Sequence, residues 1–156
     1  MSRIAPRWAM LLLVLLAQGH AMAFSKTLYL FSAVNGIVLL DGKPVQGVEV
    51  VQDYHWHWGD KQVKNVTTTD AQGRFSFPVV TGKSMTAGLL PHEPVIDQQI
   101  LFYYQGKEHQ GWFHAKHNYE DLGELHGQAL NLVCDLKDEP VGRPEIGNYG
   151  ICVLQK

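Results

Sequence analysis

Short runs of β-branched and aromatic residues, separated by Gly, Pro, Asp and Asn, constrain the fold of this 156-residue chain more than any other feature. Such runs are typical of strands, and no segment keeps the apolar period of 3.6 residues that an amphipathic helix needs. The pattern predicts an all-β protein, a single β-sandwich of about seven or eight strands. The expected strands cover residues 27–40, 44–58, 61–69, 74–80, 95–105, 111–117, 128–136 and 149–155.

Local turn chemistry supports this division. Asp41-Gly42 and Asp70-Ala71-Gln72-Gly73 are turn sequences, because Asp and Gly tolerate positive φ. In the run 74–80, Phe75, Phe77 and Val79 are expected on one face of a strand. The runs 95–105 and 111–117 are expected to form a hairpin, and 118–125 is expected to hold one helical turn.

The first 23 residues have the pattern of a cleaved signal peptide. Arg3 and Arg7 precede the apolar run 9–17, and Ala21-Met22-Ala23 offers small residues for the peptidase. Nine apolar residues are too few to span a bilayer, which needs about 20; the alternative is a buried N-terminal helix. We therefore expect a signal peptide at 1–23, a single domain at 24–156, and a periplasmic or secreted location.

Cys134 and Cys152 are the two cysteines of the chain. In an exported protein such a pair favours a disulfide, and the alternative is two free or metal-bound thiols. Closing a loop of about 18 residues contributes on the order of 3 kcal/mol in the loop-entropy model. We expect the disulfide to hold an irregular C-terminal tail that is rich in Gly and Pro.

Two segments carry a family resemblance. "VNGIVLLDGKPVQGVEVV" followed by "TTTDAQGRFSFP" resembles the carboxypeptidase regulatory-like domain, a transthyretin-like β-sandwich. Within residues 34–81, Gly36 lets another backbone pack closely, Pro44 stiffens a turn exit and Gly73 closes a turn. The resemblance implies a β-sandwich. It implies little about function, because such domains are accessory modules of many unrelated proteins.

The stretch "DYHWHWGD" at 53–60 is the most unusual in the chain. On a strand through 48–58, the even positions are mostly apolar and aromatic, whereas the odd positions carry acids and histidines. The ordinary interpretation is a half-buried strand with its histidines in water. The sharper one is a metal site, because His55 and His57 project to the same side and could share one ion. His114 and His117 are the first candidates for a further ligand, and only one of them could join.

A third interpretation is a binding surface. Tryptophan is enriched at protein interfaces, and this chain has more of it than a small sandwich core needs. We expect the "HWHW" strand and the "GWFHAKHNY" segment to lie close together and to form a partner-binding face. Its residues would be Trp56, Trp58, Trp112, His55, His57 and His114. The alternative is that the tryptophans fill the core.

No motif indicates catalysis. The chain lacks Gly-x-Ser-x-Gly, His-Glu-x-x-His and a phosphate-binding glycine loop, so we expect neither an enzyme nor a cofactor. A formal net charge of −2 gives no attraction for nucleic acid, and no second apolar run would insert into a membrane. We expect a protein partner, with the chain acting as an immunity-type inhibitor of a periplasm-acting toxin. The alternatives are a carbohydrate- or envelope-binding module and a His-based metal-binding protein.

The signal-peptide hypothesis makes a direct prediction. Cleavage after Ala23 leaves a chain that starts at Phe24. Intact-mass spectrometry of protein recovered from the cell envelope is expected to give that mass. Recovery of the chain with Met1 intact from the cytoplasm would contradict the hypothesis.

Overall fold

A computed structural model describes residues 26–155, and their fold is a β-sandwich. The signal-peptide prediction concerns residues 1–23, which lie outside the described residues. No α-helix occurs between residues 26 and 155, and within that range nothing helical could cross a membrane. Thirteen strands are present between residues 26 and 155; seven of them have five residues or more, and the others are short. The predicted all-β sandwich is confirmed.

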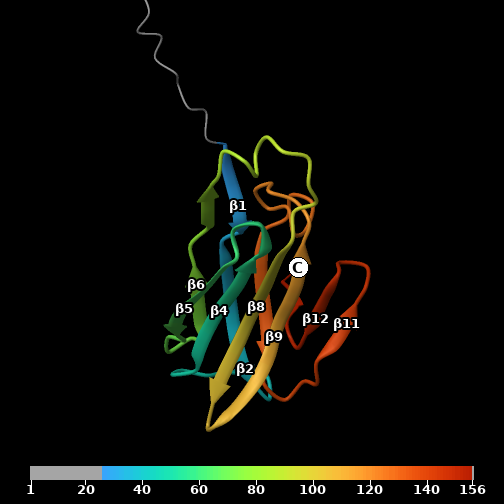
Figure 1. Cartoon of the computed structure of the whole chain (residues 1–156). Helices are drawn as coiled ribbons and strands as arrows, with labels where there is room; N and C mark the ends of the chain where they lie inside the picture. Colours follow the sequence, from blue (N-terminus) through green and yellow to red (C-terminus); the bar gives the residue numbers. More distant parts are fainter. Residues whose placement is uncertain (1–25, 156) are drawn as a thin grey trace, which may run out of the picture.

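One layer is a six-stranded antiparallel sheet with the order β11-β12-β9-β8-β4-β5. Its central strands are long and pair over most of their length, so this sheet forms the front of the molecule in Figure 1. The strands are β4 (Glu49–Trp56), β5 (Lys61–Thr68), β8 (Ile96–Tyr104), β9 (Lys107–Lys116), β11 (Val141–Arg143) and β12 (Asn148–Gly150).

The second layer has five strands in the order β13-β10-β2-β3, with β6 also pairing with β2. The β10–β2 pair is parallel and the other pairs are antiparallel. The strands are β2 (Val34–Leu40), β3 (Lys43–Pro44), β6 (Arg74–Phe77), β10 (Leu130–Asp135) and β13 (Val153–Leu154). A separate pair, β1 (Thr27–Phe31) with β7 (Val80–Lys83), extends the sandwich at the end opposite the turn between β8 and β9 (Figure 1).

The core fills the space between the two layers because each strand turns alternate side chains inward. The six-stranded sheet contributes large aromatic and aliphatic side chains, and the five-stranded sheet contributes smaller ones with two phenylalanines. The buried set includes Val50, Tyr54, Trp56, Ile100, Phe102 and Trp112 from the first sheet and Val34, Val38, Phe75, Phe77 and Leu132 from the second. Gly36 has no room for a side chain, because a Cβ there would meet the ring of Phe75.

Several local predictions are confirmed and others need correction. The disulfide Cys134–Cys152 is present and joins β10 to the segment before β13. The hairpin of β8 and β9 is present, with its turn at Gln105-Gly106. By contrast, the run 27–40 breaks at Ser32-Ala33 into β1 and β2, because its two halves pair with different partners.

Two further corrections concern single segments. Val79 is 43% exposed, because β6 ends at Phe77 and the chain leaves the inner face before Val79. The region 118–125 forms turns instead of a helical turn. This loop belongs to no sheet. One backbone hydrogen bond, from the N–H of Tyr29 on β1 to the carbonyl of Tyr119, and several side-chain contacts hold it.

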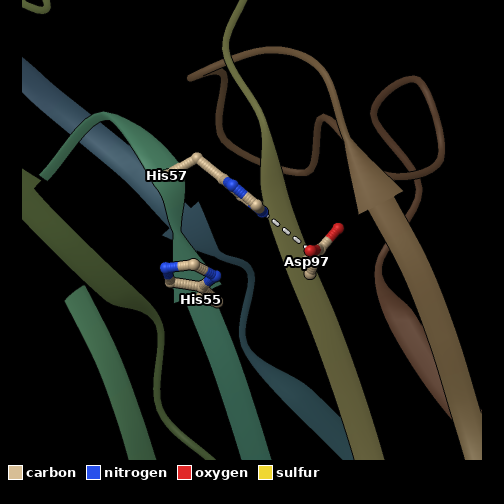
Figure 2. A group of neighbouring side chains, drawn as sticks. All are labelled: His55, His57 and Asp97. Carbon is tan, nitrogen blue, oxygen red and sulfur yellow. Dashed lines mark hydrogen bonds and ion pairs between the residues drawn. The ribbon is translucent and has the colours of Figure 1, made fainter. Parts of the chain in front are cut away.

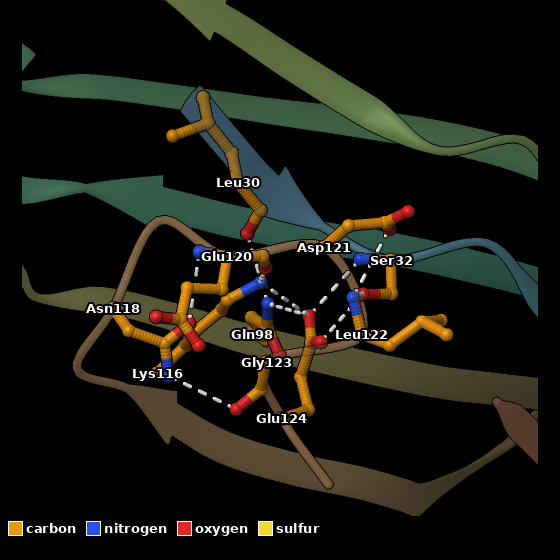
Figure 3. A network of polar contacts seen from close by, with 10 residues as sticks. All are labelled: Leu30, Ser32, Gln98, Lys116, Asn118, Glu120, Asp121, Leu122, Gly123 and Glu124. Atoms are coloured by element: carbon orange, nitrogen blue, oxygen red, sulfur yellow. Dashed lines mark hydrogen bonds and ion pairs between the residues drawn. The ribbon is translucent and has the colours of Figure 1, made fainter. Parts of the chain in front are cut away.

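A fully buried ion pair anchors that loop to the six-stranded sheet and to the end of β1 (Figure 3). The Nζ atom of Lys116 on β9 lies 3.3 Å from Oε1 of Glu124, and neither side chain is exposed. Lys116 also donates to the carbonyl of Glu120 at 2.7 Å. The Glu124 carboxylate accepts hydrogen bonds from the backbone and hydroxyl of Ser32 and from the amide of Gln98. The loop is thereby fixed to the end of β1, to β8 and to β9.

The hydrogen bonds around Glu124 also set its ionisation. Burial alone raises the pKa of a carboxyl group, because it removes water from the charged form. The charge of Lys116 and the hydrogen bonds from Ser32 and Gln98 outweigh burial and hold the pKa of Glu124 below its ordinary value. Glu124 is therefore ionised at neutral pH in the folded protein.

Candidate metal-binding site

The first candidate ligand, His55, lies on the outer face of the six-stranded sheet. Along β4 the even-numbered side chains turn into the core, so His55 and Asp53 turn to the opposite face. In the antiparallel pairing of β4 with β8, the residue opposite His55 is Asp97. The sheet register therefore places a histidine and a carboxylate side by side on one face.

The second candidate ligand comes from the turn that follows. Strand β4 ends at Trp56, and His57 begins the short 3₁₀ turn His57–Gly59. The backbone N–H of His57 still donates to the carbonyl of Val95 at 3.1 Å. That hydrogen bond extends the pairing of β4 with β8 by one residue beyond the end of β4, so the side chains still alternate between the two faces at His57. The imidazole of His57 therefore reaches the same face as His55, with 4.2 Å between the two ring centroids.

The three side chains converge at the end of the sheet (Figure 2). The Nε2 atom of His57 lies 2.8 Å from Oδ2 of Asp97. One ligand atom from each of His55, His57 and Asp97 lies within 4.8 Å of the other two. About a third to a half of each side chain is exposed, so the cluster is open to solvent on one side. We refer to these three residues as the His-His-Asp cluster.

A second carboxylate lies at the edge of the cluster. Oδ1 of Asp60 is 3.2 Å from Nε2 of His55. Asp60 ends the 3₁₀ turn in the left-handed conformation, with φ +43°, and its N–H donates to the carbonyl of His57. Left-handed backbone is uncommon outside glycine, although Asp adopts it more readily than most residues. The tight turn folds Asp60 back towards His55.

This arrangement has the chemistry of a metal site. Neutral imidazole nitrogens and carboxylate oxygens are the ligands that zinc, copper and iron commonly take from proteins. The cluster offers two nitrogens and one oxygen, and Asp60 offers another oxygen. Such a set leaves coordination positions open towards solvent.

His114, which the sequence predicts as a possible further ligand, does not join this cluster. His114 lies opposite Gln98 in the β8–β9 pairing, and Gln98 is fully buried on the inner face. His114 is therefore on the other side of the sheet from His55 and His57. His117 is also engaged elsewhere, with its Nδ1 3.2 Å from Oε1 of Glu93. The prediction that His55 and His57 project to the same side agrees with the geometry, but the third side chain beside them is that of Asp97.

Two of the three predicted surface tryptophans are core residues. Trp56 is 6% exposed and Trp112 is 1% exposed, so the prediction that both face a partner is wrong. The reason is register: Trp56 follows Tyr54 on the inner face of β4, and Trp112 lies opposite the buried Ile100. The Nε1 atom of Trp56 donates to the hydroxyl of Tyr119, so the two predicted segments do meet, but inside the sandwich.

Trp58 is the exposed member, with 38% of its surface open. Its ring packs against His92, with 4.0 Å between ring centroids, and its Nε1 donates to Oγ1 of Thr86. The loop that holds Thr86 also exposes three large apolar side chains. We refer to Trp58, Met85, Leu89 and Leu90 as the apolar patch.

Sequence reasoning missed Asp97 and Asp60 as members of the site. Asp60 follows the histidines in the sequence but lies beyond the predicted strand 44–58. Asp97 lies in a run that is predicted to pair with 111–117. The signal that could have found Asp97 is the register between two strands 40 residues apart. An antiparallel pairing of "YHW" with "VIDQ" puts Asp97 opposite His55.

Comparison with protein families identifies the chain. A family described as "Domain of unknown function (DUF6795)" matches residues 34–139, more than half of the sequence, so the chain belongs to that family. The match spans His55, His57, Asp60 and Asp97 and ends before β11. Neither the curated proteins nor the solved structures contain a significant match.

The tryptophans give a test of this geometry. Replacing Trp56 or Trp112 with Ala leaves a large cavity, and each change is expected to cost about 3–5 kcal/mol of unfolding free energy. Trp58→Ala removes a partly exposed ring and is expected to cost about 1 kcal/mol or less. Urea denaturation of the three variants measures the difference. A loss for Trp58→Ala as large as that for Trp112→Ala would contradict the placement of Trp58.

Proposed function

We propose that this member of the DUF6795 family binds a divalent transition-metal ion through His55, His57 and Asp97. The observation that carries the proposal is the mutual approach of their three ligand atoms within 4.8 Å. Ligand atoms around a tetrahedral ion at about 2.0–2.1 Å lie about 3.4 Å apart. Small side-chain rotations close that difference, and two of the three residues lie opposite each other on paired strands.

The ligand set favours copper(II) or zinc(II). Imidazole suits both ions, the only cysteines are joined in the disulfide, and calcium and magnesium prefer oxygen ligands. Among divalent ions, affinity for such a set rises towards copper(II) and falls again at zinc(II). Asp60 would be the fourth ligand, and its carboxylate together with that of Asp97 would neutralise the charge of the ion.

The proposed role is binding without catalysis, in an exported protein. Export is supported by the signal-like sequence at 1–23 and by the disulfide, because disulfides persist in oxidising compartments. The resemblance to a carboxypeptidase regulatory-like domain stays a proposal. It is supported by the turn glycines at 42 and 73, both of which have positive φ.

A second candidate function is protein binding at the apolar patch. The exposed fractions of Met85, Leu89 and Leu90 are 59%, 76% and 53%, and clustered apolar exposure of this kind often marks an interface. An immunity-type inhibitor would use such a patch. A carbohydrate- or envelope-binding role could use Trp58 as a stacking platform, although its ring already packs on His92.

Metal titration tests the first proposal. Purified, untagged protein is titrated with Zn²⁺ and with Cu²⁺ by calorimetry, and one ion per chain is expected to bind. The double change His55→Ala with His57→Ala removes both nitrogens and is expected to weaken binding by at least about 100-fold. Asp60→Asn is expected to weaken it less, by about 10-fold.

A matched control comes from two exposed histidines elsewhere. His117→Ala with His126→Ala removes the same number of imidazoles from residues outside the cluster and is expected to leave the affinity unchanged. Binding that survives the His55 and His57 changes but is lost with the control changes would refute the site. A parent protein that binds neither ion would refute the function.

A further inference from the structure

A row of uncharged polar side chains crosses the outer face of the five-stranded sheet. Ser76 on β6 lies opposite Asn35 on β2, and Asn35 lies opposite Asn131 on β10. The N–H of Gln155 donates to the carbonyl of Asn131 at 2.8 Å, which extends the pairing of β13 with β10 by one residue. Phe75, beside Ser76 in the chain, is buried, so the row lies on the outer face. With about 4.8 Å between neighbouring strands, the row is about 14 Å long.

An apolar row runs beside the polar one. Ile37 on β2 lies opposite Val133 on β10, and Val133 lies opposite Val153 on β13. At the β6 end of this row stands Arg74, opposite Ile37. Along β2, β6, β10 and β13, the outward-facing side chains carry a charge only at Arg74 and Asp135. A face that meets only water usually carries more charged groups, so this combination of amides and aliphatic side chains needs another explanation.

The polar row runs into a groove where the chain crosses from one sheet to the other. The groove has a volume of about 460 Å³ and lies between β2, β6 and the segment 67–70, which leads from β5 into the following turn. Asn35, Arg74, Ser76 and Gln155 are among its lining residues. Small-molecule sites commonly have volumes of about 300–1,000 Å³. A second hollow of about 220 Å³ is also lined by Gln155, so the two meet there. We refer to the groove and this hollow together as the polar furrow.

Hydrogen bonds fix the wall of the furrow at the crossing between the sheets. The buried hydroxyl of Thr69 accepts from the N–H of Val48 at 3.0 Å and donates to the carbonyl of Val45 at 2.7 Å. At the next position, Oδ1 of Asp70 accepts two backbone N–H groups of the turn, at 2.9 and 2.8 Å. A wall that is already ordered reduces the entropy that a ligand loses by ordering it.

The charges in the furrow favour a neutral ligand. Arg74 and Asp70 are the only charged residues among the described residues that line it, and they have opposite signs. Arg74 forms no ion pair with any residue between 26 and 155, so its guanidinium donors are free for a ligand. Asp70 still has Oδ2 as an acceptor, and the hydroxyl and amide groups of the row both donate and accept. The furrow therefore suits a ligand that has many groups of both kinds.

We infer that the polar furrow binds a neutral carbohydrate chain. Each sugar hydroxyl both donates and accepts, which matches the groups of Asn35, Ser76 and Gln155. The C–H faces of the sugar rings would contact Ile37 and Val133 in the neighbouring apolar row. The length of the row and its two adjoining hollows fit more than one sugar ring. This site is independent of the metal proposal, because it lies on the other sheet of the sandwich.

A glycan array and NMR test the inference in sequence. Labelled protein is applied to an array of neutral and acidic oligosaccharides, and binding to at least one neutral oligosaccharide is expected. The strongest neutral binder is then titrated into ¹⁵N-labelled protein. The side-chain NH₂ signals of Asn35, Asn131 and Gln155 are expected to shift saturably, whereas that of Asn65 on the other sheet is not. An array that shows no neutral binder, or shifts that leave these three signals in place, overturns the inference.

Variants decide whether the row makes the contact. Asn35→Ala with Ser76→Ala changes two exposed side chains and is expected to weaken binding at least about 10-fold. If that variant does not fold, Gln155→Ala, which lies outside every strand, is expected to weaken binding in the same direction. Gln99→Ala removes an amide from the outer face of the other sheet and is the matched control, and Trp58→Ala tests the apolar patch. Binding that is lost with either control variant, or kept in the furrow variants, overturns the inference.

Discussion

The structure depends on one buried ion pair, that of Lys116 and Glu124. An ammonium and a carboxylate without solvent contact are costly to bury, and the cost is offset only where every charge is also hydrogen-bonded. Here the carboxylate is surrounded by Ser32 and Gln98, and the ammonium reaches the carbonyl of Glu120. These contacts join β1, β8, β9 and the loop 118–128, which otherwise has no ladder to hold it. The ion pair therefore connects the loop 118–128 to the strands of the sandwich.

The two faces of the six-stranded sheet have separate roles in this account. On the outer face, the register of β4 with β8 brings Asp97 to His55, and the following turn adds His57. On the inner face, the same strand β8 carries Gln98, whose side-chain amide donates to the carboxylate of Glu124 in the ion pair. Alternation along β8 thus separates a solvent-open cluster from a buried polar network. A one-residue slip of β8 would exchange Asp97 and Gln98 and remove both features.

Local pattern was enough to predict much of the fold. Alternation assigned the two faces of β4 correctly, including the shared side of His55 and His57. The predicted disulfide between Cys134 and Cys152 is also present. The tryptophans show the limit of this reasoning. The number of tryptophans favoured an exposed binding surface. The alternation that turns His55 to the outer face of the sheet, however, turns Trp56 into the core. In that case a count of residue types was a weaker guide than the position of each residue on its strand.

The remaining features depend on pairing between distant segments. Asp97 joins the histidines only through the β4–β8 register, and Glu124 meets Lys116 only after the loop folds under β1. Acids in a polar loop are usually solvated, so the loop sequence alone does not mark Glu124 as a buried charge. Lys116 follows His114 by two residues on β9, and both side chains therefore lie on the inner face of the sheet. This spacing is the one local sign of a buried charge.

The most direct test of this account is a double-mutant cycle on the ion pair, read by urea denaturation. Lys116→Met and Glu124→Gln each leave one buried partner unmatched and are predicted to cost about 3–5 kcal/mol, whereas the double change Lys116→Met with Glu124→Gln is predicted to cost much less than their sum. Because the pKa of Glu124 is lowered on folding, its contribution is present above its unfolded pKa of about 4.3 and is lost as pH falls through the folded value. Single changes that leave stability within about 0.5 kcal/mol of the parent, or costs that simply add, would contradict the central place of this pair.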